Sequence, residues 1–222
     1  MSDWKIPTVE KKRFRKKILN WSKDNLRDYP WRKKRNPYKV LISEILLTRT
    51  KAKQVVPVYN EFMERYPNVR SILNMKFEIV AELIKSLGLA FRADMLKTLS
   101  EQLKNDYNKK IPGNVNRLKK LRGVGNYCAN AVLCFGMGKK RAILDANFIR
   151  IYKRVFGIRP KTKTAKSDKY FWGFAETMLP KKKYVEYNYG ILDLGGYICK
   201  NRNPECNICP VNEICKKYNK SL

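Results

Sequence analysis

The sequence predicts an all-α fold. Apolar residues recur with a period close to 3.6 along almost the whole chain, which is the spacing of one helix face, and no sustained period-two alternation indicates a sheet. Hydrophobic residues make up 44% of the 222 residues, enough for a packed core and too many for a disordered basic chain. At roughly 100 to 200 residues per domain, this length fits one domain or two small ones.

Helix boundaries follow from residues that start or stop helices. Pro37 suits the first turn of a helix, Gly88 suits a left-handed C-cap, and Pro67, Gly157 and Pro180 stop helices. The apolar period between these signals predicts, in order, helices over residues 38–50, 53–65, 77–87, 91–105, 114–121, 126–135, 145–156, 165–178 and 184–198.

The charge balance points to a polyanionic partner. The chain has 49 Lys and Arg against 19 Asp and Glu, a net charge of +30, so nucleic acid is the first expectation and an anionic membrane surface the second. Histidine is absent, which excludes Ser/His/Asp and Cys/His nucleophiles and Cys/His zinc sites. The sequence has no apolar signal segment or membrane span, so we expect an intracellular protein of the cytoplasm or nucleoid.

Two glycines lie in a short hairpin between two predicted helices. In the segment Arg122, Gly123, Val124 and Gly125, glycine permits positive φ, and backbone N–H groups at a helix N-terminus attract anions. A plain helix–helix turn with a glycine C-cap would have the same pattern. Because Lys119 and other cations flank it in a polycationic chain, we expect these residues to bind phosphate.

Asp145 follows the hairpin by about twenty residues and opens a helix after two apolar residues. A carboxylate at a helix N-terminus stays ionised and can stabilise developing positive charge. An ordinary N-cap aspartate is the alternative, and one residue can serve both roles.

Four cysteines lie near the C-terminal end of the sequence. Cys199, Cys206, Cys209 and Cys215 suit either tetrahedral zinc or a cubane iron–sulfur cluster, and the spacing alone does not separate the two. Cys128 and Cys134 lie in an apolar helix and are expected to be buried side chains.

In this order and at these separations, the hairpin, Asp145 and the cysteines resemble the helix-hairpin-helix (HhH-GPD) DNA glycosylases of the endonuclease III type. The cysteine spacing matches that family's [4Fe-4S] loop, so the resemblance favours an iron–sulfur cluster over zinc. It covers about residues 21–215 and implies two lobes: a six-helix barrel lobe over 29–135, and a cluster lobe made of 1–28 and 136–222. The implied partner is double-stranded DNA with a mismatched base, bound by a monomer.

The residue at the position of Tyr127 distinguishes family members with lyase activity from those without it. Lyase-proficient members have a lysine two residues after the second hairpin glycine, whose amine forms a Schiff base. Tyr127 instead resembles archaeal-type G/T-mismatch thymine glycosylases, as do the segments 44–50 and 145–148. The resemblance therefore implies a monofunctional enzyme that hydrolyses the N-glycosidic bond of thymine or uracil opposite guanine. The alternatives are an adenine glycosylase acting on A/G mismatches and a non-catalytic DNA-binding module.

The resemblance also assigns roles to single residues. Asp145 would stabilise the oxocarbenium-like sugar, and Glu44 and Tyr127 would read the base. Leu89 is the candidate wedge that enters the stack, and Arg49 the candidate plug or reader of the orphan guanine. The remaining expected DNA contacts are Lys200 and Arg202 in the cysteine loop. In the hairpin, Arg122 replaces the proline usual in the family, which is expected to cost rigidity.

Overall fold

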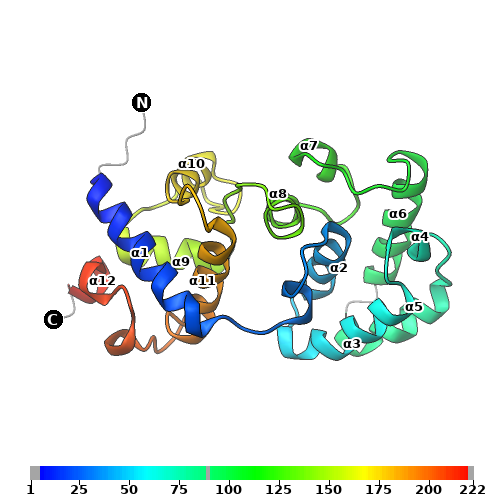
Figure 1. The fold of residues 1–222 in the computed structure, drawn as a ribbon, viewed down its shortest axis with the longest axis horizontal. Coiled ribbons are helices and arrows are strands. Elements are labelled where there is room, and N and C mark those ends of the chain that lie inside the picture. Colours follow the sequence, from blue (N-terminus) through cyan, green and yellow to red (C-terminus); the bar gives the residue numbers. More distant parts are fainter. Residues whose placement is uncertain (1–5, 89–90, 220–222) are drawn as a thin grey trace. The chain divides into compact units, whose positions relative to one another are not determined.

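A computed structural model describes residues 6–88 and 91–219 (Figure 1). These residues form helices without any strand, which confirms the predicted fold class. The α-helices are α1 (Thr8–Asn25), α2 (Pro37–Leu47), α3 (Ala52–Arg65), α4 (Val69–Ile72), α5 (Phe77–Ile84), α6 (Phe91–Asn105), α7 (Val115–Leu118), α8 (Asn126–Ala131), α9 (Ala146–Phe156), α10 (Lys169–Thr177), α11 (Tyr184–Tyr197) and α12 (Lys216–Asn219). The shorter 3₁₀ and π turns are η1 (Pro30–Arg32), η2 (Lys85–Leu87), η3 (Val132–Gly136), η4 (Cys206–Ile208) and η5 (Asn212–Ile214). None of the helices in the described ranges is both long and apolar enough to cross a bilayer.

The chain divides into two compact units. Unit 1 comprises Met1–Arg27 and Lys140–Leu222, so it joins the N-terminal helix to the C-terminal third of the chain. Unit 2 is the continuous segment Asp28–Lys139.

Helix α2 is the central element of unit 2. Asn36 begins it, because its side-chain oxygen accepts hydrogen bonds from the backbone N–H groups of Tyr38 at 2.9 Å and Lys39 at 3.1 Å. The helix packs against α3, α8 and η3. Gly136 in η3 meets Pro37 so closely that a Cβ at residue 136 would lie 2.6 Å from the proline Cα. The core of unit 2 is therefore built around α2.

Unit 1 packs α11 between α1 and α9. Gly190 on α11 allows α1 to approach, because a Cβ there would lie 3.0 Å from the Ile18 side chain. An aromatic cluster fills the core; the Phe14 and Phe156 rings are 5.0 Å apart, and those of Tyr152 and Phe174 are 5.2 Å apart.

Several predicted boundaries shift in the structure. The helix expected over 38–50 ends at Leu47, and the one expected over 165–178 begins at Lys169 because Asp168 is its N-cap. The helix expected over 126–135 stays α-helical to Ala131 and then becomes a π turn. The prediction for residues 91–105 is confirmed at both ends.

Candidate functional site

The two hairpin glycines differ in backbone conformation and in the space around them. Gly123 has φ +82°, and a Cβ there would collide with the side chain of Met95. Gly125 is extended and exposed, and a Cβ there would meet nothing. The side chain of Val124 is buried, and its N–H donates to the carbonyl of Leu121 at 3.1 Å. Val124 therefore holds the turn, and the exposed part of the hairpin is Arg122, Gly123 and Gly125.

Gln102 on α6 forms hydrogen bonds to two residues of this hairpin. Its Oε1 accepts the backbone N–H of Arg122 at 2.7 Å, and its Nε2 donates to the carbonyl of Lys120 at 2.9 Å. Proline at position 122 would have no N–H for the first of these bonds. Arg122 therefore supplies a hydrogen bond that a proline at this position could not make, while the expected loss of rigidity stays a prediction.

Glu44 and Tyr127 lie on helices that pack together, α2 and α8. Both side chains are half-buried. Burial, and then the nearby Glu44 carboxylate, raise the pKa of the Cys128 thiol well above its ordinary value. Glu44 therefore lies near Cys128, the residue that follows Tyr127 on α8. Cys128 and Cys134 are buried as predicted.

Arg49 follows the end of α2 in an unusual backbone conformation. Its φ is +56°, which is rare for a residue with a Cβ, and its side chain is exposed. Leu89, the other residue expected to enter the DNA stack, lies outside the described residues.

Asp145 is the N-cap of α9 in unit 1. Its Oδ1 accepts the backbone N–H groups of Asn147 at 2.8 Å and Phe148 at 3.0 Å, and its Oδ2 accepts Asn147 Nδ2 at 2.7 Å. Burial raises the pKa of Asp145, although these hydrogen bonds and the positive charge of Arg150 act in the opposite direction. The carboxylate is thus fixed in orientation and partly removed from water.

The four C-terminal cysteines line one pocket. Its other walls include the apolar side chains of Ile151, Val155, Leu194, Ile198 and Val211. Burial raises the pKa of Cys209 to about 11, and the other three thiols add to this effect. Within the described ranges, no three His, Cys, Asp or Glu side chains lie close enough to hold a single metal ion.

Two arginines of α9 hold the start of the cysteine loop. Arg154 donates to Cys199 Sγ at 3.3 Å and to the carbonyls of Lys200 at 2.6 Å and Asn201 at 2.9 Å. Arg150 donates to the carbonyl of Cys199 at 2.7 Å and to Asn147 Oδ1 at 2.7 Å. One side of the cysteine pocket is therefore connected to the cap residue Asp145 through Arg150 and Asn147.

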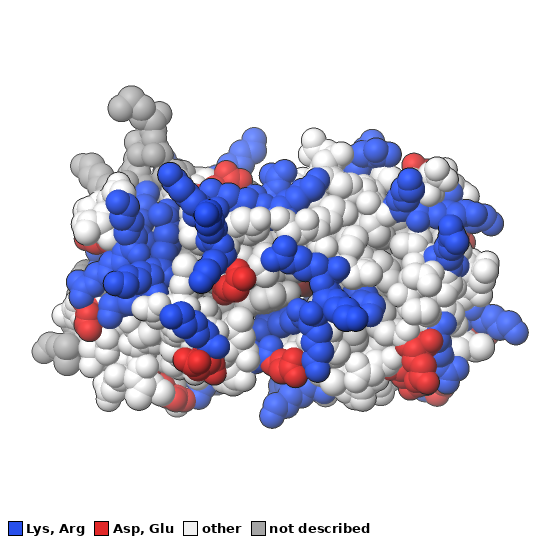
Figure 2. Space-filling model, viewed as in Figure 1, with Lys and Arg blue, Asp and Glu red and all other residues white. Residues whose placement is uncertain are grey.

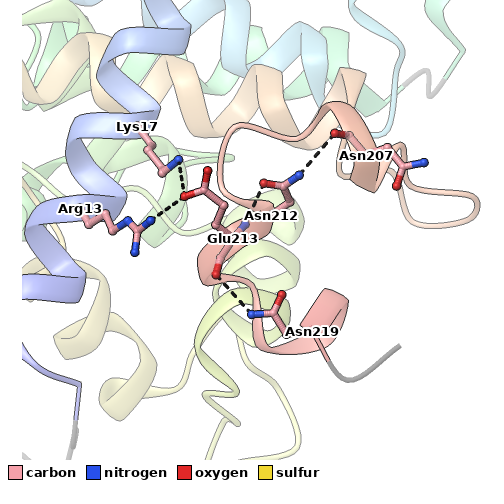
Figure 3. Close-up of polar contacts among 6 residues, drawn as sticks. All are labelled: Arg13, Lys17, Asn207, Asn212, Glu213 and Asn219. Carbon is pink, nitrogen blue, oxygen red and sulfur yellow. Dashed lines mark hydrogen bonds and ion pairs between the residues drawn. The ribbon is translucent and has the colours of Figure 1, made fainter. Parts of the chain in front are cut away.

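The rest of the loop is attached to α1 by ion pairs (Figure 3). Oε2 of Glu213 lies 2.5 Å from Nη2 of Arg13 and 3.1 Å from Nζ of Lys17. Both partners lower the pKa of Glu213, and Lys17 has the larger effect. The two cations expected to touch phosphate, Lys200 and Arg202, are both exposed, and Lys200 forms an ion pair with Glu205.

Basic side chains are spread over much of the face drawn in Figure 2, and acidic side chains form separate spots there. Helix α1 contributes a dense run of basic residues, which are Lys11, Lys12, Arg13, Arg15, Lys16 and Lys17. Such a surface suits a polyanion.

Residues 42–176, more than half of the chain, match the family model described as HhH-GPD superfamily base excision DNA repair protein. The chain belongs to this superfamily. A thymine/uracil-DNA glycosylase of Pyrobaculum aerophilum is 38% identical over 217 residues, which cover 96% of this chain and 94% of that protein. The solved structure of a thermostable thymine-DNA glycosylase matches with a TM-score of 0.89 at 38% identity and covers 96% of this chain and 100% of that one. An adenine DNA glycosylase of Buchnera aphidicola is 34% identical over 92% of this chain but only 58% of its own length.

These matches confirm the predicted family and the enzyme class, a DNA glycosylase of the HhH-GPD superfamily. The match to the HhH-GPD model ends at residue 176, so the four cysteines lie beyond it.

The sequence did not point to Gln102, Asn147, Arg150 and Arg154. Asn147 is the second residue of α9, where an N-cap side chain accepts a backbone N–H, and Arg150 follows it by three positions, the spacing of neighbours on a helix surface. Gln102 gives no such signal, because its partners lie about twenty residues away along the chain.

Proposed function

We propose that this HhH-GPD protein hydrolyses the N-glycosidic bond of thymine or uracil mispaired with guanine and leaves an abasic site. The observation that carries the proposal is the carboxylate of Asp145, held by three hydrogen bonds at the start of α9. The similarity to a thymine/uracil-DNA glycosylase over nearly its whole length supports the choice of base.

In this mechanism the mispaired nucleotide first leaves the stack, at a cost of a few kcal/mol that is lowest for a mispair. Breaking the glycosidic bond then develops positive charge on the sugar, which the ionised Asp145 stabilises. The same carboxylate can orient the attacking water. Because its two oxygens are already bonded to donors, Asp145 needs no reorganisation when the charge appears.

Unit 2 would supply the residues that read the base. Glu44 and Tyr127, on the packed helices α2 and α8, can accept and donate hydrogen bonds to the pyrimidine edge. Tyr127 has no amine, so no Schiff base with the sugar is expected at this position.

DNA would be held mostly through its backbone. The candidate phosphate contacts are the exposed glycines of the hairpin, the exposed Lys12 and Lys16 of α1, and Arg202; Arg49 is the candidate reader of the orphan guanine. Leu89 remains the candidate wedge. We further propose that unit 2 is the barrel lobe and unit 1 the cluster lobe of a monomeric enzyme.

The four cysteines fit a [4Fe-4S] cluster. Four thiols around one apolar-walled pocket are the donor set that such a cluster takes, and Arg154 provides a donor to Cys199 Sγ. A bound cluster would cross-link the loop that carries Lys200 and Arg202. Purified protein should then be brown, with broad absorbance near roughly 400 nm. Colourless, folded protein with stoichiometric zinc would support the alternative metal.

Adenine removal is the second candidate function, favoured by the 34% identity to an adenine DNA glycosylase. In that reaction Glu44 would protonate the purine. The test is to incubate purified protein with duplexes that contain a T:G, U:G or A:G mispair, with and without alkali. We expect strand breaks at T and U only after alkali. Breaks at A would favour the second function, and binding without base release would indicate a DNA-binding module.

A further inference from the structure

Arg92 is a fully buried arginine in the first turn of α6. Its Nη2 donates to the carbonyl of Thr48 and to Thr50 Oγ1, the latter at 2.5 Å, and its Nη1 donates to the carbonyl of Leu87 at 3.5 Å. One guanidinium therefore joins the segment that follows α2 to the end of η2.

Both segments end helices, where carbonyl groups without helical partners carry partial negative charge and attract cations. Thr48 is the C-cap of α2, and Leu87 is the last residue of η2. Each lies directly before a residue with positive φ, Arg49 at +56° and Gly88 at +69°. Arg92 bonds the peptide carbonyl that precedes Arg49 and the side-chain hydroxyl of the residue that follows it, so it holds the chain on both sides of Arg49.

Packing alone does not account for this arginine. Removing a guanidinium from water is costly, and an apolar side chain of similar volume would fill the space without that cost. One of its donors, Nε, has no hydrogen-bond partner within the described residues. The three bonds that Arg92 does make all go to the two loops, so the conformation of these loops is what the buried charge maintains.

We propose that Arg92 is a positioning residue for mismatch recognition: it holds Arg49 in the left-handed conformation from which the Arg49 side chain reads the base opposite the flipped nucleotide. The inference rests on the proposed function, in which Arg49 contacts the orphan guanine. Arg92 itself touches no DNA and acts only through the 48–50 segment.

A double-mutant cycle between Arg92 and Arg49 tests this role. Dissociation constants are measured for duplexes with a G:T mispair and with G:C, using the full chain, the single variants Arg92→Lys and Arg49→Ala, and the double variant. Lysine keeps the charge but loses the planar fork that reaches both loops. Each single change should lower the preference for the mispair by about tenfold, the order expected for one good arginine–base contact, and the double variant should lower it no further.

Matched variants separate this role from a general loss of stability. Lys97→Met removes an exposed cation from the same helix and should leave the preference unchanged. Thr50→Val removes one acceptor of Arg92 without emptying the buried site, and it should lower the preference in the same direction as Arg92→Lys. Thermal melting of each variant shows whether it is folded.

Additive losses in the cycle, or lower melting temperatures with the mispair preference intact, would overturn the inference. Base release from the same G:T duplex is measured in parallel. A wild type that prefers the mispair but releases no base would count against the proposed function, whereas a non-additive cycle in binding would still support the role of Arg92. A wild type without any preference for the mispair would overturn the role of Arg92 directly.

Discussion

Asn147 donates from Nδ2 to Oδ2 of Asp145 at 2.7 Å, while its own Oδ1 accepts Nη2 of Arg150 at 2.7 Å. The charged Arg150 side chain therefore fixes the orientation of the Asn147 amide, and the NH₂ group of this amide faces the Asp145 carboxylate. Arg150 in turn donates to the carbonyl of Cys199, the first of the four cysteines. The orientation of the proposed catalytic carboxylate thus depends on the same side chain that anchors the cysteine loop.

Asp145→Asn should lower single-turnover base release on a T:G duplex by roughly a hundredfold or more, because a carboxylate that stabilises transition-state charge contributes more than a ground-state hydrogen bond. DNA binding should survive, since an aspartate repels phosphate. Both quantities are measured on the same duplex. If release stays within a few fold of wild type, or binding and release fall together, Asp145 is only a helix cap and Glu44 becomes the leading carboxylate.

The rate of base release should fall at acidic pH as Asp145 takes up a proton. Burial places this pKa above the ordinary aspartate value, and the Asn147 hydrogen bond opposes that rise. Asn147→Leu removes the bond, so the pKa rises further and the rate should be lost at higher pH than in wild type. Lys153→Met, which removes an exposed cation from the same helix, is the matched control. If the rate of base release falls at the same acidic pH in Asn147→Leu as in wild type, a group other than Asp145 controls the pH dependence.

Tyr127 should make the enzyme monofunctional. Borohydride reduces Schiff bases, so it should trap no covalent DNA adduct above background, and strands should break only after alkali. Tyr127→Lys places an amine at this position and should produce some trapped adduct. Efficient trapping by the wild type would mean that a different amine performs a lyase step.

The hairpin should depend on Gln102. Gln102→Leu removes both the acceptor for Arg122 and the donor to Lys120, so binding to matched and mismatched duplexes should weaken together, by about 1 kcal/mol per lost bond or roughly fivefold each. Gln102→Glu keeps the acceptor and should lose less. The measurement is affinity for both duplexes by titration at fixed salt. Weakening of the mismatched duplex alone would argue against a backbone-binding hairpin.

Local signals predicted some elements well. Helix α6 is predicted at both ends, and Asp145 caps α9 as expected, because capping and apolar period are encoded within a few residues. The end of α2 was missed by three residues. There Thr48 and Arg49 leave the helix where Arg92, more than forty positions along the chain, binds the carbonyl of Thr48. Contacts of that range have no signature in a sequence window.

The same limit applies to the proposed DNA-binding residues. The excess of cations and the glycine hairpin indicate a DNA-binding protein, but which cations are available depends on their partners. Lys200 and Arg202 look equivalent in sequence. Both side chains are exposed, and it is the ion pair of Lys200 with Glu205 in the folded loop that distinguishes them.

Arg202 should therefore contribute more to DNA binding than Lys200. A cation that contacts phosphate releases a counterion, so removing it reduces the slope of log K against log salt by about one unit. Arg202→Ala should produce that change for matched and mismatched duplexes alike. Lys200→Ala should produce a smaller one, because Glu205 already neutralises part of its charge. In the variant Glu205→Gln, Lys200 is released, and the salt slope should become steeper than in wild type. Equal effects of the two alanine variants would show that the Lys200–Glu205 pair opens when DNA binds.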